Sequence, residues 1–300
     1  MSPTSYWINK GDDMAKILHG APVIEAMNQN TKNQIAELKA KGVKPTLAIV
    51  RVGERAEDMY YEHNAEKRCD ELGAGHTKIV FPSDVTEEEV EAAIIRFNED
   101  ESVHGILLLR PLPKHLNDDK LRNLISPIKD VDGCTDVSLS GVFAGEKRGF
   151  PPCTPHAAMR ILNFYGYTPV TNGEQASVIG RSLVIGRPVS MMLLKDDFTV
   201  NICHSKTANL SDVTKRAAVL IAAAGQRHLV TEDFVNEDQV VIDVGVNWDE
   251  EKQGITGDVD FKNVEPIVKA ITPVPGGVGT VTTSILVRHV VEAAERALKE

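Results

Sequence analysis

Short β-branched runs alternate with longer amphipathic segments in the first part of the chain. The runs with strand character are TLAIVRV (46–52), TKIVF (77–81) and VHGILLL (103–109). The segments that follow them have helical spacing, and they cover 59–73, 86–100 and 117–125. A strand, a helix and a further strand in this order form the unit from which parallel sheets are built. The pattern therefore predicts an α/β fold for this part of the chain.

A second series of apolar runs begins after a stretch rich in proline and turn residues. The runs are ASVIG (176–180), FTVNICH (198–204), AAVLIAAAG (217–225) and QVVIDVGV (239–246). Each is nearly continuously apolar, which is typical of strands buried on both faces of a parallel sheet. The stretch between the two series, 147–175, marks the crossing between two α/β domains. The final segment, 280–300, has the pattern of a long amphipathic helix.

The composition excludes several classes of protein. The 300 residues are 42% hydrophobic and 25% charged, which is a globular mixture. The apolar runs are far shorter than the roughly 20 residues that span a bilayer, and the N-terminus lacks a basic segment before an apolar one. We therefore expect a cytoplasmic protein without a membrane partner. The net charge of -10 argues against a nucleic-acid partner, because phosphate backbones require a basic surface.

The four cysteines show no metal-binding pattern. They are Cys69, Cys134, Cys153 and Cys203, and no two of them form a CxxC pair. We interpret them as reduced thiols in or near the core, and we expect no metal site.

Residues 178–188, VIGRSLVIGRP, place two glycines where a strand is expected to become a helix. Gly180 allows a sharp turn, Gly186 allows the helix to approach closely, and Pro188 is tolerated in the first helical turn. The N-terminus of that helix then faces an anion. The spacing is a variant of the dinucleotide fingerprint, with Ser182 in place of the second glycine. A tight turn without a ligand therefore remains the alternative interpretation.

The next strand indicates which dinucleotide is bound. It ends in CHSKT (203–207), at the strand tip where NAD enzymes carry an acidic residue for the ribose hydroxyls. Ser205 and Lys206 stand there, and Arg181 lies in the preceding turn. A hydroxyl and cations suit a 2′-phosphate, so the sequence favours NADP over NAD.

Three further stretches have the composition of ligand loops. The glycine-rich ITPVPGGVGTVTTS (271–284) leads into the final helix, and it is either a hinge or a place where bare backbone N–H groups meet a ligand. RPLPKH (110–115) follows a strand, and PIKDVDGC (127–134) follows a helix. Each of these two is either part of a site or an ordinary turn.

Together these motifs resemble the methylenetetrahydrofolate dehydrogenase/methenyltetrahydrofolate cyclohydrolase family. The stretches GILLLRPLPKH, PIKDVDG, PPCTP, VIGRSLVIGRPVSMMLL, CHSKT, VVIDVGVN, GDVDF and ITPVPGGVGTVT occur in the family's order and at about its spacing, from near residue 45 to the final helix. The resemblance implies an N-terminal folate and catalytic domain over 1–150, a Rossmann-type NADP-binding domain over 151–282, and a folate cleft between them. It also implies a homodimer and a final helix, 283–300, that packs back on the first domain.

The resemblance also implies which residues form the site. Tyr61 and Asp132 occupy catalytic and substrate-binding positions, and Asp132 is expected to accept hydrogen bonds from the pterin ring. The other folate contacts implied are Pro275, Gly276, Gly277, Val278 and Gly279. The NADP contacts implied are Gly180, Arg181, Ser182, Gly186, Ser205 and Val246.

Two positions depart from the family's pattern. Members with both activities carry a lysine four residues after the tyrosine, and a reading without gaps places Tyr61 at the tyrosine position and Ala65 at the lysine position. Lys67 does not replace this lysine. It lies two residues beyond Ala65, so its side chain points about 200° around the helix axis from that of Ala65. The family's glutamine position holds Leu109, and the leucine after it is replaced by Arg110.

These departures leave three hypotheses. Hydride removal from 5,10-methylenetetrahydrofolate needs orientation rather than a base, because the two flanking nitrogens stabilise the cation that forms. Hydrolysis of the methenyl product does need a positioned acid or base. The first hypothesis is an NADP-dependent dehydrogenase with little or no cyclohydrolase activity, and the second is a bifunctional enzyme in which Arg110, His63 or another group replaces the lysine. The third, a folate- or nucleotide-binding homologue without turnover, is disfavoured by the intact nucleotide motifs.

Overall fold

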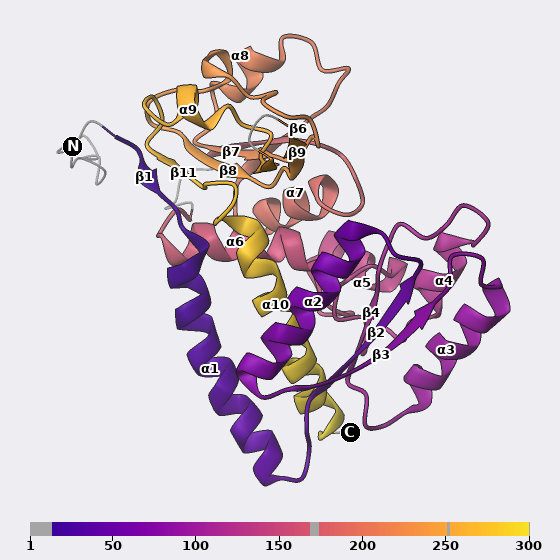
Figure 1. Cartoon of the computed structure of the whole chain (residues 1–300). Helices are drawn as coiled ribbons and strands as arrows, with labels where there is room; N and C mark the ends of the chain where they lie inside the picture. Colours follow the sequence, from indigo (N-terminus) through magenta and orange to yellow (C-terminus); the bar gives the residue numbers. More distant parts are fainter. Residues whose placement is uncertain (1–13, 169–173, 251–252, 300) are drawn as a thin grey trace.

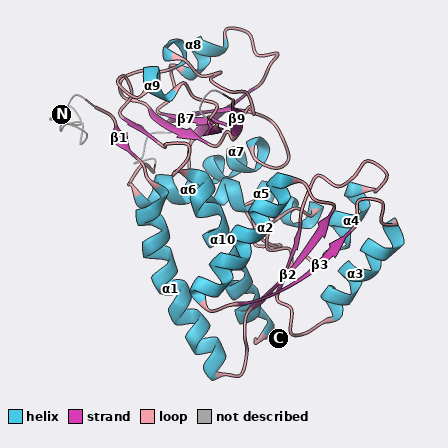
Figure 2. Ribbon diagram, viewed as in Figure 1, coloured by secondary structure: helices cyan, strands magenta, loops and turns pink. Residues whose placement is uncertain are grey.

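The computed structural model describes residues 14–168, 174–250 and 253–299, and its described strands form two parallel sheets and one hairpin (Figure 1). Helices pack around both sheets (Figure 2). The α/β class predicted from the sequence is confirmed, with one parallel sheet in each of two parts of the molecule.

The first sheet has three parallel strands in the order β3-β2-β4. Its strands are β2 (Thr46–Val52), β3 (Gly75–Phe81) and β4 (Gly105–Leu108), and the helices after them are α2 (Ala56–Leu72), α3 (Glu87–Glu99) and α4 (Asp118–Leu124). All six elements lie where the hydrophobic pattern predicts them. The start of α3 is specified locally, because the side chains of Thr86 and Glu89 each accept a hydrogen bond from the other's backbone N–H.

The second sheet has six parallel strands in the order β1-β11-β8-β7-β5-β6. Their bounds are β1 (Lys16–Ile17), β5 (Gln175–Ile179), β6 (Thr199–Cys203), β7 (Val219–Ala222), β8 (Val240–Asp243) and β11 (Ala270–Ile271). The helices and hairpin of this part are α7 (Gly186–Lys195), α8 (Leu210–Thr214), the 3-10 turn η1 (Glu232–Phe234), α9 (Phe261–Val264), β9 (Asn247–Asp249) and β10 (Gly254–Thr256). Strand β5 lies between β7 and β6, so the strands that follow it in the sequence are placed on both of its sides. A crevice at the carboxyl end of such a strand is the common ligand position in open α/β sheets.

One expectation about this sheet is wrong. The run 198–204 was predicted to form a strand buried on both faces, but β6 is the edge strand and Ile202 is 40% exposed. The same expectation is correct for β7 and β8, all of whose residues are buried. Apolar content predicts that a segment is a strand, but it does not specify the order of the strands in the sheet.

Four further helices complete the fold, and the hydrophobic pattern predicts only the last of them. They are α1 (Gly20–Ala40), α5 (Asp136–Ala144), α6 (Cys153–Phe164) and α10 (Val278–Ala297). Helix α6 lies in the stretch 147–175 that we assign to the crossing between the domains, where the prolines of PPCTP (151–155) indicate a loop rather than a helix. Proline is compatible with the first turn of a helix, so Pro155 does not interrupt α6.

Helix α10 connects the two parts of the molecule. It contacts α1, α2 and α6 and also reaches β2 and β4, and Figure 1 shows it running beside α1 into the lower part of the molecule. Most of its side chains are buried, including Ile285, Leu286 and Val290. Its burial on several sides explains why a helix far along the sequence from the first sheet is part of the same core.

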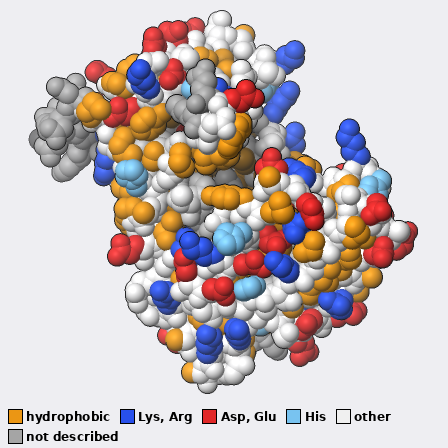
Figure 3. Space-filling view, in the orientation of Figure 1, with side chains coloured by type: hydrophobic (Ala, Val, Ile, Leu, Met, Phe, Trp, Pro, Cys, Tyr) orange, Lys and Arg blue, Asp and Glu red, His pale blue; other side chains and the backbone are white. Residues whose placement is uncertain are grey.

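The described helices and the visible surface bear on two further expectations. Within the described residues, no helix is both long enough and apolar enough to cross a membrane. On the face drawn in Figure 3, acidic and basic side chains are interspersed and leave no broad basic area.

Candidate active site

The glycine-rich turn after β5 has the close approach that the sequence predicts. Gly180 has a φ of 140°, and a Cβ built on it would lie 2.2 Å from the carbonyl oxygen of Ala223. A Cβ on Gly186 would lie 2.2 Å from the carbonyl oxygen of Gly180. The Ser182 hydroxyl accepts a hydrogen bond from the Ile185 N–H at 3.1 Å, which shapes the turn before α7. Backbone atoms thus lie where a side chain at either position would be, so both glycines are required for the tight turn between β5 and α7, the place where dinucleotide-binding folds hold a pyrophosphate.

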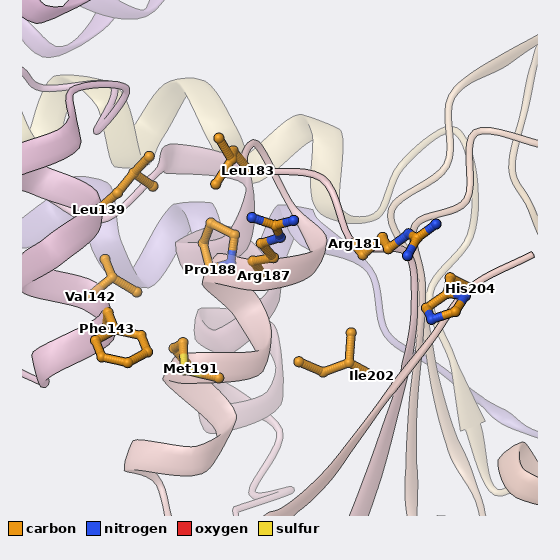
Figure 4. Close-up of a pocket in the computed structure, with 10 residues that line it drawn as sticks. All are labelled: Leu139, Val142, Phe143, Arg181, Leu183, Arg187, Pro188, Met191, Ile202 and His204. Carbon is orange, nitrogen blue, oxygen red and sulfur yellow. The ribbon is translucent and has the colours of Figure 1, made fainter. Parts of the chain in front are cut away.

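A pocket of about 540 Å³ lies beside this turn (Figure 4). Arg181 and His204 lie at one end of it, and Val142 and Phe143 lie at the opposite end. Ser205, at the tip of β6, is exposed. The structure thus brings Arg181 to the strand tip that carries Ser205, which is the arrangement expected for a 2′-phosphate.

Two buried carboxylates join the loops at the carboxyl edge of the second sheet. Asp243, at the end of β8, accepts hydrogen bonds from the N–H groups of Gly245 (2.9 Å), Asp258 (3.0 Å) and Val259 (3.0 Å). Burial raises the pKa of Asp243 to about 7. These bonds explain the motifs VVIDVGVN and GDVDF, and they hold in place the loop that presents Val246, whose side chain is 63% exposed.

Asp258 has the larger set of partners. Its Oδ2 accepts from the N–H groups of Ala224 (2.6 Å) and Gly225 (2.9 Å), and its Oδ1 accepts from the Gln226 N–H (2.8 Å) and the Asn247 Nδ2 (2.9 Å). Because the carboxylate is fully buried, no water can replace these bonds without rearrangement.

We expect Asp258→Ala to lower the free energy of unfolding by roughly 2–4 kcal/mol, because it leaves several buried N–H groups without an acceptor. Urea denaturation of the two proteins measures the difference. The control is Asp233→Ala, which removes an exposed carboxylate from the same part of the molecule and should change the unfolding free energy by less than about 0.5 kcal/mol. Equal values for both variants would contradict a structural role for the Asp258 carboxylate.

The first part of the molecule brings Tyr61 and Asp132 together. The pKa of Tyr61 is raised well above its usual range by burial and by the nearby Asp132 and Cys153. The pKa of Asp132 is raised to about 7, mainly by burial and by the charge of Asp130, while the Cys153 thiol and Arg110 act in the opposite direction. An acid with a pKa near neutrality is typical of functional sites.

The two positions that depart from the family's pattern are buried and apolar. Ala65 is fully buried on α2, and Leu109 is only 5% exposed. His63 and Lys67, which lie near Ala65 on α2, have exposed side chains. Arg110, which follows Leu109, is partly buried. Of the two groups that we considered as replacements for the lysine, the structure therefore favours Arg110.

Arg110 is held by a carboxylate. Its Nε donates to the Asp118 Oδ1 at 2.8 Å, and its Nη2 donates to the Asp118 Oδ2. This pair raises the pKa of Arg110 and lowers that of Asp118, so Arg110 stays protonated. Arg110 can therefore stabilise negative charge or orient a ligand, but it cannot accept a proton.

A small cavity of about 90 Å³ joins the two halves of the predicted site. Arg110 and Asp132 line it from the first part of the molecule, and Leu183 and Val184 line it from the nucleotide turn. The turn that carries Asp132 and the nucleotide turn that carries Leu183 lie about 50 residues apart in the sequence, and they meet at this cavity.

The loop 275–279 lies at the N-terminus of α10. Gly276 has a φ of 105°, its carbonyl accepts from the Gly20 N–H at 2.8 Å, and a Cβ on Gly277 would lie 2.5 Å from the Pro273 carbonyl oxygen. Pro275 precedes these two glycines, and Val278 and Gly279 are the first two residues of α10. Helix α10, which begins in this stretch, packs on α2, the helix that carries Tyr61.

Comparison with known proteins identifies the family. Residues 18–132 match the family model "Tetrahydrofolate dehydrogenase/cyclohydrolase, catalytic domain", and residues 152–298 match "Tetrahydrofolate dehydrogenase/cyclohydrolase, NAD(P)-binding domain". The chain belongs to the tetrahydrofolate dehydrogenase/cyclohydrolase family. The family resemblance predicted from the sequence is thereby confirmed.

Individual relatives agree over nearly the whole chain. The bifunctional protein FolD of Carboxydothermus hydrogenoformans is 50% identical over 283 residues, which cover 94% of this chain and 98% of that protein. The bifunctional enzyme FolD of Campylobacter jejuni has a TM-score of 0.90 at 37% identity, covering 94% and 99% of the two chains. The methylenetetrahydrofolate dehydrogenase-cyclohydrolase of Trypanosoma brucei, solved with NADP and an inhibitor, has a TM-score of 0.89 at 30% identity, covering 96% and 99%.

For this member of the tetrahydrofolate dehydrogenase/cyclohydrolase family, the prediction of NADP is confirmed by the NAD(P)-binding domain and by the relative solved with that cofactor. In the described part of the chain there is no group of three or more His, Cys, Asp or Glu side chains that could hold a metal ion. The features that sequence reasoning missed are the Arg110–Asp118 pair and the contact between His156 and His289, because a single polar residue gives no sign in the sequence of what it contacts.

Proposed function

We propose that this protein is an NADP-dependent 5,10-methylenetetrahydrofolate dehydrogenase that hydrolyses its methenyl product slowly or not at all. The observation that carries the proposal is the shared cavity in which Arg110 and Asp132 meet the nucleotide turn at Leu183 and Val184. A folate held by the first two side chains would lie next to a dinucleotide held by the turn.

The residues of the chain would contribute position rather than proton transfer to the dehydrogenase step. Bound NADP supplies the hydride acceptor. The turn that Gly180 and Gly186 allow would hold its phosphates at the start of α7, and Tyr61 and Asp132 would orient the folate so that donor and acceptor carbons lie about 3–3.5 Å apart. Since the folate nitrogens stabilise the cation that forms, this step does not depend on the missing lysine.

The proposed weakness of the cyclohydrolase rests on Ala65 and Leu109. Hydrolysis needs a group that activates water and transfers protons, and such a group accounts for about 10²–10⁴ in rate. The methyl group of Ala65 and the side chain of Leu109 are both buried and apolar, so neither can do this.

A bifunctional enzyme remains the second candidate, and two observations favour it. Relatives at up to 50% identity carry the name of a bifunctional protein. In addition, the pKa of Asp132 lies near 7, so this carboxylate could accept a proton from water while the nearby Arg110 stabilises the charge. A homologue that binds folate or nucleotide without turnover is the third candidate.

One assay separates the three candidates. The purified protein is incubated with methylenetetrahydrofolate and NADP, and NADPH and methenyltetrahydrofolate are followed separately. Formation of both products supports a dehydrogenase without hydrolase, NADPH without lasting methenyl product supports a bifunctional enzyme, and no NADPH supports a binding protein.

We expect Asp132→Ala to lower kcat/KM for the folate by about 10- to 150-fold, the effect of losing a hydrogen bond to a charged acceptor, and to leave NADP affinity nearly unchanged. In the wild-type protein, kcat/KM should rise as the pH rises through about 7, because the carboxyl of Asp132 loses its proton there and becomes a better acceptor. The variant should lack this rise.

A matched control exists in the same cavity. Asp119 also lines it, but its side chain is 81% exposed, and Asp119→Ala should leave both the folate kinetics and the pH profile close to those of the wild type. An unchanged profile in Asp132→Ala would show that Asp132 is only a turn residue.

We also propose a homodimer, in which each chain has a catalytic domain over 1–150 together with the final helix over 283–300, and an NADP-binding domain over 151–282. The packing of α10 on α1, α2 and β2 supports this division. Light scattering at several protein concentrations tests the dimer.

A further inference from the structure

A second large cavity adjoins the nucleotide pocket at Val142 and shares no lining residue with the small cavity at Asp132. It has a volume of about 410 Å³ and is lined by the end of α5, by α6, by the end of α7 and by α10. It does not include Tyr61, Arg110, Asp132 or Arg181. The function proposed above therefore leaves it unexplained.

The net charge of the side chains around this cavity is opposite in sign to the net charge of the whole chain. Five cationic side chains line it: Lys147, Arg160, Lys195, Arg288 and Arg296. Three acidic side chains do so as well: Glu146, Asp196 and Glu292. In a chain with a net charge of -10, the cavity is thus a local excess of positive charge.

Several of these side chains already have partners. Arg296 pairs with Glu292 at 2.8 Å, and its guanidinium also lies 4.3 Å from the centre of the Phe150 ring. The Lys195 Nζ donates to the carbonyl oxygen of Gly145 at 2.9 Å. The remaining acids offer little to the other cations, because Glu146 pairs with Arg148 and burial raises the pKa of Asp196.

Arg160 and Arg288 are the two arginines of this cavity without a paired carboxylate in the described part of the chain. Within residues 14–168, 174–250 and 253–299, neither of them forms an ion pair with a carboxylate. Both are partly buried, and burial together with the charge of Arg288 lowers the pKa of Arg160, while the charge of Glu292 acts in the opposite direction. Two neighbouring, partly buried guanidinium groups repel each other, and an anion between them would offset this repulsion.

A chain of hydrogen bonds determines how Arg160 is oriented. The Nδ1–H of His289 donates to the Val131 carbonyl oxygen at 2.8 Å, so the Nε2 of His289 is left as an acceptor. It accepts from the Nδ1 of His156 at 3.0 Å, and the Nε2 of His156 in turn accepts from the Nε of Arg160 at 3.3 Å. Both rings are neutral in this arrangement, in agreement with the lowered pKa of each, which for His289 is about 4.

This chain uses only the Nε–H of Arg160. The terminal N–H groups of Arg160, and all those of Arg288, have no hydrogen-bond partner among the described residues. A guanidinium that is fixed through one N–H and presents two others is suited to an oxyanion, and two such groups together suit the several oxygens of a phosphate.

We propose that this cavity is a binding site for a small phosphate-bearing anion, which is held by the guanidinium groups of Arg160 and Arg288. The site is separate from the nucleotide turn and from Asp132. It does not depend on whether the protein hydrolyses methenyltetrahydrofolate.

Calorimetric titration tests the proposal with three probes: inorganic phosphate, pyrophosphate and the tricarboxylate citrate. The full chain is used at constant ionic strength and with saturating NADP, so that phosphate cannot occupy the nucleotide turn. We expect one saturable site per chain for pyrophosphate, with weaker binding of phosphate. Arg288→Gln and Arg160→Gln should each raise the Kd by about 10- to 100-fold.

The control is Arg96→Gln, which removes one positive charge from the exposed surface of α3 and should leave the Kd unchanged. Arg288→Gln keeps the test valid if loss of Arg160 disturbs folding, because Arg288 takes no part in the histidine chain. Binding that does not saturate, or that is equally strong in Arg96→Gln and Arg288→Gln, would overturn the site. Tighter binding of citrate than of pyrophosphate would overturn the assignment to phosphate.

Discussion

Methenyltetrahydrofolate should accumulate mole for mole with NADPH when the purified protein oxidises methylenetetrahydrofolate. In our proposal Ala65 and Leu109, both buried and apolar, stand at the family's lysine and glutamine positions, so the cleft would lack the groups that transfer protons during hydrolysis. Loss of such a group costs about 10²–10⁴ in rate, enough for the product to decay at the rate of the buffer alone. The measurement is the decay of the methenyl absorbance at several enzyme concentrations.

The double variant Ala65→Lys with Leu109→Gln is the matching gain-of-function test. It should restore measurable hydrolysis, although only in part, because a catalytic lysine also needs surroundings that lower its pKa. The unmutated enzyme gives the decisive result. Decay that accelerates in proportion to its concentration would establish the bifunctional candidate, and Asp132 and Arg110 would then be the first residues to replace.

Arg181→Ala should weaken NADP binding by about 1.5–3 kcal/mol, which is roughly 10- to 150-fold in Kd, and should hardly affect NAD. The physical reason is the charge-assisted hydrogen bond between a guanidinium and the 2′-phosphate, which NAD lacks. Arg181 lies at the end of the pocket nearest the tip of β6, where Ser205 is exposed (Figure 4). Fluorescence titration with each cofactor measures both constants.

A matched charge control lies in the same part of the chain. Arg216 is exposed between α8 and β7, and Arg216→Ala should leave the affinities for both cofactors unchanged. Equal losses for NADP and NAD in Arg181→Ala would refute its assignment to the 2′-phosphate.

Much of the site could be predicted because its elements are local. Gly180 and Gly186 are required wherever a backbone turns tightly between a strand and a helix, and the structure shows backbone atoms where their side chains would be. The position of Asp132 in a turn was equally readable. What it contacts was not, because its partners Arg110 and Cys153 come from other segments whose approach depends on how the sheets and helices pack.

The sequence by itself determined the alternation of strands and helices, the nucleotide turn and the presence of Ala65 where we place the family's lysine, since each of these depends on residues close together along the chain. Only the tertiary structure decided that β6 is an edge strand, that Arg110 is locked to Asp118, and that α6 and α10 bring His156 against His289. Strand order and contacts between helices are set by the packing of whole faces, and a single polar residue contributes too little to that packing to reveal its partner in advance.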